Sequence, residues 1–127
     1  MTRFLVSSGS YLEPKIGFSR AVRVGNHVSI AGTAPIPQDG GPTPNGCYEQ
    51  MKLCLAIAEE ALFQAGANMA DVVRTRIMLT DIATWEDAAR AHGEVFADIR
   101  PVTTVVQVTG FVDPAWVVEI EVDAIIP

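Results

Sequence analysis

The chain has 127 residues, of which 49% are hydrophobic and only 19% are charged. This length is enough for one domain with its own core, and we expect residues 1–127 to form it. The net charge of −6 would repel a phosphate backbone, so nucleic acid is not an expected partner. No apolar run approaches the roughly 20 residues that span a bilayer, and the start of the chain lacks the apolar core of a signal peptide. We therefore expect a cytoplasmic protein with no membrane partner.

Strand patterns dominate the first third of the chain. Residues 4–6 predict a short strand at the edge of a sheet. Residues 21–24 and 27–32 flank a Gly-Asn pair, which is favoured in tight turns, and predict a hairpin. Residues 35–46 are too rich in proline and glycine for regular structure and predict the longest loop.

Residues 47–65 carry the strongest helix pattern. Apolar residues recur every three or four positions, and Gly66 provides a C-terminal stop. Cys47 and Cys54 lie seven residues apart in this helix, about 10 Å along its axis, which is too far for a disulfide. We expect both to be buried thiols in a reducing cytoplasm. The apolar stripe consists of Met51, Leu55, Ala58, Leu62 and Ala65.

Residues 71–79 predict the next strand, and a second helix follows it. We expect Thr84 to cap this helix, with Asp87 at the capping-box position. The helix should end near residues 98–99, because Pro101 disfavours helical backbone before it. Its inward face is expected to hold Trp85, Ala88, Ala89, His92, Val95 and Phe96.

Residues 102–108 and 116–126 predict the last two strands. The order is strand, strand, strand, helix, strand, helix, strand, strand. Such an order is typical of an α+β fold, here a mixed six-stranded sheet with two helices on one face. No helix remains to cover the other face, so we expect a second subunit to cover it. The high hydrophobic content of so short a chain also favours an oligomer.

Two carboxylates lie within the last predicted strand. Glu119 and Glu121 are two residues apart and therefore point to one face, while Val118 and Ile120 point to the other. The pair either lines a wet cavity or faces solvent. If Glu119 lies in a cavity, desolvation raises its pKa towards neutrality, which suits a general base or a residue that holds a water.

The arginines Arg74 and Arg76 alternate with apolar residues in the predicted strand 71–79. We expect Arg76 to enter a cleft, where it either binds an anionic group of the substrate or pairs with Glu119 or Glu121. The alternative is an ordinary surface salt bridge worth about 0–1 kcal/mol. Thr103 and Thr104 offer hydroxyls to a neutral or small polar ligand, or are ordinary strand residues.

No metal or cofactor is expected. His92 lies among apolar residues of the second helix and is expected to pack there, and His27 borders the hairpin turn and is expected to be exposed. The two histidines and the two cysteines are not spaced as metal ligands. No Ser/His/Asp set, phosphate-binding glycine loop or dinucleotide fingerprint can be assembled.

Five motifs occur together in one order: Ile16–Val22 (IGFSRAV), Val28–Thr33 (VSIAGT), Ala65–Ala67 with Asp71–Val73, Arg100–Pro101, and Val118–Glu121. This arrangement resembles the Rid proteins, also called YjgF/YER057c/UK114 or reactive intermediate deaminase A-like proteins, over essentially the whole chain. The resemblance implies a chorismate-mutase-like fold and a homotrimer with a small-molecule cleft at each subunit boundary. It also implies hydrolysis of enamines or imines to a 2-oxo acid and ammonia.

The resemblance assigns roles to individual residues. Glu119 matches the glutamate that positions the attacking water, Gly32 the glycine whose backbone lines the pocket, and Phe18 the early aromatic residue, without the usual hydroxyl. The position of the substrate-binding arginine holds Thr103, which cannot form a bidentate bond to a carboxylate. Val105 replaces a cysteine of the family. The chain therefore resembles a divergent branch of the family.

Three functions follow from these observations. The first is a hydrolase or deaminase that acts on a reactive imine, enamine or related nitrogen compound, with Glu119 aligning water and Arg76 or backbone donors holding the substrate. The second is a non-catalytic binding or regulatory trimer that senses a metabolite in the same cleft. The missing arginine favours either this function or an altered substrate. The third is an endoribonuclease, against which the negative charge and the lack of an acid–base histidine pair both argue.

Overall fold

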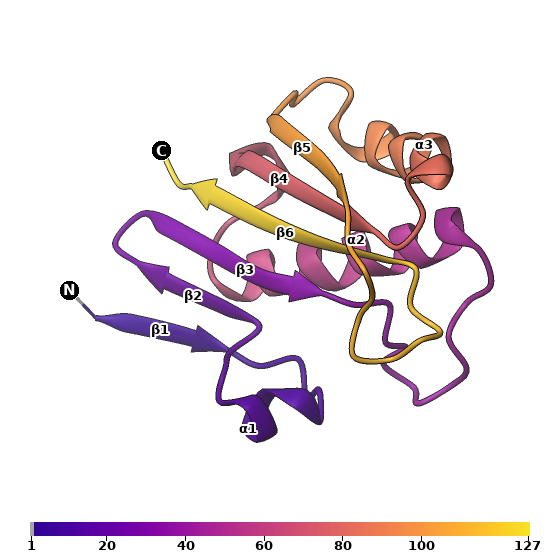
Figure 1. The fold of residues 1–127 in the computed structure, drawn as a ribbon. Coiled ribbons are helices and arrows are strands. Elements are labelled where there is room, and N and C mark those ends of the chain that lie inside the picture. Colours follow the sequence, from indigo (N-terminus) through magenta and orange to yellow (C-terminus); the bar gives the residue numbers. More distant parts are fainter. Residues whose placement is uncertain (1) are drawn as a thin grey trace.

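The computed structural model describes residues 2–127. Its centre is a six-stranded sheet in the order β1-β2-β3-β6-β4-β5, in which only β4 and β5 are parallel neighbours. The sheet is mixed, as predicted, and β1 lies at its edge (Figure 1). The strands are β1 (Arg3–Val6), β2 (Ala21–Val24), β3 (His27–Thr33), β4 (Val72–Leu79), β5 (Val102–Gln107) and β6 (Val118–Ile125).

Two long helices pack on the same face of this sheet, as predicted. They are α2 (Cys47–Gln64) and α3 (Trp85–Phe96), which lie behind the sheet in the view of Figure 1. The hydrophobic core lies between them and the sheet, where Met51 and Leu62 of α2 meet Ile77 of β4 and Ile120 of β6, all fully buried. Each such side chain contributes about 1.5–3 kcal/mol by leaving water.

Three short elements were missed by the sequence patterns. One is the helix α1 (Leu12–Ile16), which ends at Gly17 with a φ of 91°. The other two are 3-10 turns over Met69–Asp71 and Ile82–Thr84. Each spans five residues or fewer, so none is long enough to show a helical period.

Thr84 is the N-cap residue of α3, as predicted, but the predicted capping box is wrong, because the Thr84 side chain makes no capping hydrogen bond. The Thr84 hydroxyl donates to the Asp81 carbonyl at 2.7 Å, and the Asp81 side chain instead accepts from the Ala83 amide. The 3-10 turn before α3 therefore takes the place of a capping box. Trp85 and Ala89 are exposed rather than buried, because the buried face of α3 runs through Ala88 one helical step away.

The loop over residues 35–46 has no helix or strand, as predicted. Gln50 at the start of α2 fixes it, although sequence reasoning did not single this residue out. The buried amide of Gln50 donates to the carbonyls of Pro44 (3.0 Å) and Ala115 (2.9 Å) and accepts from the Val117 amide (2.8 Å). These bonds join the loop to the chain just before β6.

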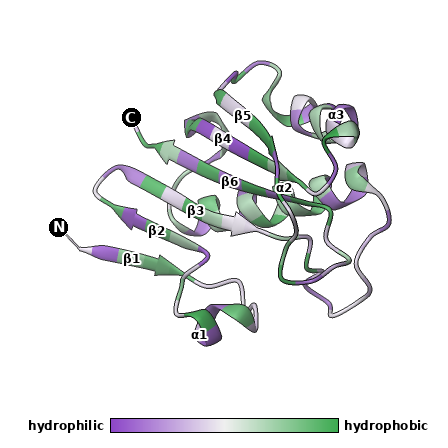
Figure 2. Ribbon diagram, viewed as in Figure 1, coloured by the Kyte–Doolittle hydropathy of each residue, from purple (hydrophilic) through white to green (hydrophobic). Residues whose placement is uncertain are grey.

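The face of the sheet opposite α2 and α3 carries the polar residues of the strands. Arg74, Arg76, Glu119 and Glu121 all point to this open face. Thr75, Ile77, Val118 and Ile120 point to the core, as the alternation predicted. Figure 2 shows this alternation as hydrophilic and hydrophobic bands along the strands. None of the helices in residues 2–127 is long and apolar enough to cross a membrane.

Candidate active site

A β-bulge brings Gly32 next to Glu119. Ile30 pairs with Val122 and Thr33 pairs with Ile120, so two residues of β3 stand opposite one residue of β6. As a result, a Cβ atom at position 32 would lie 3.2 Å from Oε1 of Glu119. Glycine at this position therefore leaves the space that the carboxylate occupies.

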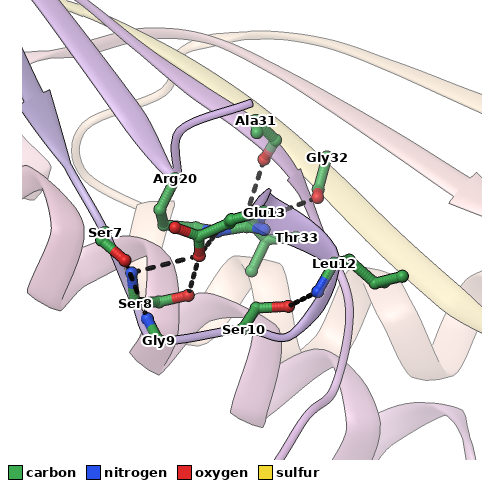
Figure 3. Close-up of polar contacts among 10 residues, drawn as sticks. All are labelled: Ser7, Ser8, Gly9, Ser10, Leu12, Glu13, Arg20, Ala31, Gly32 and Thr33. Carbon is green, nitrogen blue, oxygen red and sulfur yellow. Dashed lines mark hydrogen bonds and ion pairs between the residues drawn. The ribbon is translucent and has the colours of Figure 1, made fainter. Parts of the chain in front are cut away.

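Arg20, which the sequence analysis did not single out, connects the predicted site residues. Its side chain is almost fully buried, and its Nη1 atom donates to the Gly32 carbonyl at 2.8 Å and to the Thr33 hydroxyl at 3.1 Å (Figure 3). The guanidinium carbon also lies 5.2 Å from the centre of the Phe18 ring. Phe18, Gly32 and Glu119, which the resemblance selected, are thus grouped around one arginine.

Glu13 of α1 partly compensates the charge of Arg20. It is buried, its Oε2 atom lies 3.9 Å from Nε of Arg20, and it accepts bonds from the amide and hydroxyl of Ser8 (Figure 3). Burial alone would raise the pKa of Glu13, but the hydrogen bonds from Ser8 and Ser7 and the charge of Arg20 together lower it. Glu13 therefore stays anionic. The sequence did not predict this pair, because neither Glu13 nor Arg20 lies in a segment long enough to show the repeat of apolar residues that marks a helix or a strand.

The half-buried Glu119 has a raised pKa. Desolvation is the main cause, the charge of Arg20 opposes it, and the nearby Glu121 adds to it. In residues 2–127 no cation lies within ion-pair distance of Glu119. A carboxylate with a raised pKa is a stronger base than an exposed carboxylate, so it accepts a proton from water more readily at neutral pH.

Arg76 pairs with Glu121 on the open face. The distance from its Nη1 atom to Oε2 of Glu121 is 2.7 Å, and both side chains are about 40% exposed, at 43% and 40%. The structure shows the pairing with Glu121, which both the predicted cleft and the alternative of a surface salt bridge allow, and the entry of Arg76 into a cleft stays a prediction. A role for Arg76 in holding a substrate anion stays a prediction. Thr104 lies in register beside Arg76 on β5.

Thr103 points to the opposite side of β5 from Thr104. Its hydroxyl lies 2.8 Å from the hydroxyl of Thr75, which in turn lies 2.8 Å from Nε2 of His92. The two threonines therefore do not face one ligand from a single side of the strand. His92 packs against Phe96 with ring centres 4.6 Å apart, as predicted for this histidine. Burial lowers the pKa of His92.

Two hollows adjoin Arg20 on the helix side of the sheet. The smaller has a volume of about 80 Å³ and is lined by Ser8, Thr33 and Ile57 among others. The larger, about 240 Å³, follows α2. Neither of them includes Glu119. Within residues 2–127, no three histidine, cysteine or acidic side chains are grouped as a metal site would need.

The chain matches the family described as Endoribonuclease L-PSP over residues 9–126. An uncharacterised protein of Streptomyces coelicolor is 40% identical over 119 residues, which cover 94% of this chain and 89% of that protein. A crystal structure from Mycobacterium tuberculosis, described as a member of the highly conserved YjgF/YER057c/UK114 family, is 45% identical with a TM-score of 0.90. It covers 98% of this chain and 100% of that one.

A more distant structure shares the fold. It is Escherichia coli TdcF with bound serine, which is 21% identical with a TM-score of 0.81 and covers 87% of this chain and 88% of that one. Its strands and helices follow the same chorismate-mutase-like arrangement that the family resemblance implied. From the match over residues 9–126 and these relatives, the chain belongs to the Endoribonuclease L-PSP family, also called the YjgF/YER057c/UK114 or Rid family.

Proposed function

We propose that this protein is a small-molecule hydrolase that cleaves imines or enamines with a water positioned by Glu119. Membership of the Rid family supports a small-molecule-binding or imine-deaminase-type role. The observation that carries the catalytic proposal is the state of Glu119. It is a half-buried carboxylate with a raised pKa, has no ion-pair partner in residues 2–127, and lies against the bulge at Gly32.

The reaction needs little beyond position and a proton acceptor. Glu119 accepts a proton from water as the water oxygen attacks the imine carbon, and the electrons of the C=N bond move to nitrogen. That proton then passes to the nitrogen to give a carbinolamine. As the C–N bond breaks, Glu119 takes the hydroxyl proton and passes it to the departing nitrogen, so the products are a carbonyl compound and ammonia. The Gly32 bulge, held by Arg20, fixes the carboxylate during these steps.

The cleft is proposed to form between subunits of a homotrimer. Neither α2 nor α3 covers the open face, and apolar side chains at the ends of the sheet are exposed there, including Leu5 and Val102, each at 58%. Burial of such surface by a second copy of the chain is favourable. The hollows beside Arg20 do not include Glu119, so a neighbouring chain would supply the remaining wall.

A second candidate function is a non-catalytic trimer that binds a metabolite in the same cleft. Thr103 favours it, because this residue stands where the family resemblance places a substrate-binding arginine, and its hydroxyl is already bonded to Thr75. The bound serine of TdcF supports a small amino-acid-like ligand for that protein, and here only as a proposal.

One experiment separates the two functions. The purified protein is incubated with imines generated by an amine or amino-acid oxidase, and ammonia release is compared with spontaneous hydrolysis. Release that is lost in Glu119→Gln supports catalysis. A rise in the melting temperature with metabolites, without any faster release, supports binding. Release that is the same in the wild type and in Glu119→Gln would refute the catalytic role of Glu119.

A further inference from the structure

The charges around Glu119 bear on which imine the site accepts. Imines fall into two classes: those derived from amino acids carry a carboxylate next to the reacting carbon, and those derived from simple amines carry none. A site for the first class needs a free cation within reach of that carboxylate, because an unpaired charge in a partly dry cleft is costly. Within one subunit the candidate cations are Arg20, Arg74 and Arg76, and every neighbouring copy of the chain likewise holds Thr103 at the position where the family resemblance places the substrate-binding arginine.

Arg20 is not free to bind a substrate anion. It is 4% exposed, its Nη1 atom is bonded to the Gly32 carbonyl and the Thr33 hydroxyl, and Glu13 compensates its charge. Its Nε atom has no hydrogen-bond partner in residues 2–127, but neither of the two hollows that Arg20 lines includes Glu119, so an anion bound to Arg20 there would not lie beside that carboxylate. Arg20 therefore organises the wall of the site without offering its charge to the cleft.

The two arginines of β4 are also unsuitable. Arg76 already binds Glu121 at 2.7 Å. Arg74 lies four residues, about 13 Å, along β4 from Met78, the residue that pairs with Glu119. A carboxylate bonded directly to an imine carbon beside Glu119 does not extend that far.

The open face is acidic instead. Strand β6 places Glu119, Glu121 and Asp123 on this face. They face the guanidinium groups of Arg74 and Arg76 from β4 and the imidazole of His27 from β3, whose Nε2 atom lies 3.9 Å from Asp123. Asp123 is further occupied by a 3.0 Å bond from the Ser29 hydroxyl. This balance repels a substrate carboxylate and attracts a protonated imine.

We infer that the preferred substrates are imines without a carboxylate, bound as iminium cations beside Glu119. This inference rests on the proposed function and narrows it to one chemical class. For such a substrate the balanced reaction is R–CH=NH2⁺ + H2O → R–CHO + NH4⁺. The water oxygen forms the new C–O bond, and Glu119 carries one water proton to the nitrogen. As the C–N bond breaks, Glu119 carries the second water proton, now on the hydroxyl group, to the departing nitrogen. No oxidant or reductant is needed.

The test compares two imines that differ only in the carboxylate. Monoamine oxidase generates one from 2-phenylethylamine, and L-amino acid oxidase generates the other from phenylalanine. Ammonia and aldehyde or oxo-acid formation are measured with the full chain and with Glu119→Gln, whose folding is verified by its melting temperature. We expect a kcat/KM at least about tenfold higher for the carboxylate-free imine.

Glu121→Gln gives the second arm. This change frees the Arg76 guanidinium, so the preference for the carboxylate-free imine should narrow by several-fold. An unchanged preference in this variant would overturn the electrostatic explanation. Equal or faster hydrolysis of the carboxylated imine by the wild type, still dependent on Glu119, would overturn the substrate class and leave the proposed function standing. Acceleration of neither imine would overturn both.

Discussion

Gly32 and Glu119 lie so close that a methyl group on Gly32 would meet the Glu119 carboxylate at 3.2 Å. This contact is tighter than side chains ordinarily make, and the carboxylate oxygen is the atom that must give way. The φ angle of Gly32 is not in the left-handed region, so the backbone itself accepts alanine. Glycine is therefore required at position 32 for the position of the Glu119 carboxylate and not for the backbone conformation of the bulge.

The first prediction concerns Gly32→Ala. The added methyl group should displace the Glu119 carboxylate by a few tenths of an ångström and lower imine hydrolysis about tenfold to a hundredfold, with a change in unfolding free energy below about 1 kcal/mol. Steady-state ammonia release and urea unfolding measure the two effects. The matched control is Gly93→Ala in α3, where an added Cβ has no neighbour within 4 Å. This control should gain about 0.5–1 kcal/mol and keep full activity, and an equally active Gly32→Ala would contradict the role of the contact.

The second prediction concerns the pH dependence of stability. The raised pKa of Glu119 means that the folded state binds its proton more tightly than the unfolded state does. The resulting stabilisation is fully present below the unfolded pKa and is lost as pH rises through the folded pKa. Glu119→Gln removes this loss, so the variant should be more stable than the wild type at pH 7–8.

The advantage of Glu119→Gln should shrink as the pH falls through the raised pKa of Glu119, and it should be gone at about pH 4, where the wild-type carboxyl is protonated in both states. Urea unfolding from pH 4 to pH 8 at one fixed protein concentration measures it. Glu59→Gln, a change at an exposed carboxylate of α2, is the control and should give no such divergence. A variant that is less stable than the wild type at pH 8 would show that Glu119 is stabilised rather than strained by its surroundings.

The third prediction concerns the buried pair of Arg20 and Glu13. Arg20→Met removes one partner and leaves the Glu13 carboxylate buried without its cation, which should cost about 3–5 kcal/mol. The double change Arg20→Met with Glu13→Gln should recover part of this loss, because no unpaired charge remains. Chemical unfolding of the two single variants and the double variant forms a double-mutant cycle. Strictly additive losses would mean that the two charges do not interact.

The regular elements could be predicted because their periods are long enough to read. The apolar stripe of α2 and the alternation of Arg74 and Arg76 in β4 placed both the core and the open face correctly. The pairing of Arg20 with Glu13 could not be predicted, because it joins a five-residue helix to a residue before β2 through tertiary contacts alone. The bulge at Gly32 was also missed, because it is a property of the register between β3 and β6.

The fourth prediction concerns Gln50, which positions the start of the strand that carries Glu119. Gln50→Met keeps the size of the side chain but removes three hydrogen bonds and leaves the carbonyls of Pro44 and Ala115 and the Val117 amide without this partner. Buried polar groups left unpaired should cost about 2–4 kcal/mol in total. Activity should fall as well, because Val117 lies two residues before Glu119 on the same segment.

The control for Gln50→Met is Gln64→Met at the other end of α2. Among residues 2–127 the side chain of Gln64 bonds only to Glu60 on the helix surface, so its loss should change stability by less than about 0.5 kcal/mol. Thermal unfolding and ammonia release are measured for both variants. If Gln50→Met loses stability but keeps full activity, the amide network stabilises the fold without positioning Glu119. If it keeps both, the loop over residues 35–46 is anchored by its other contacts and Gln50 is dispensable.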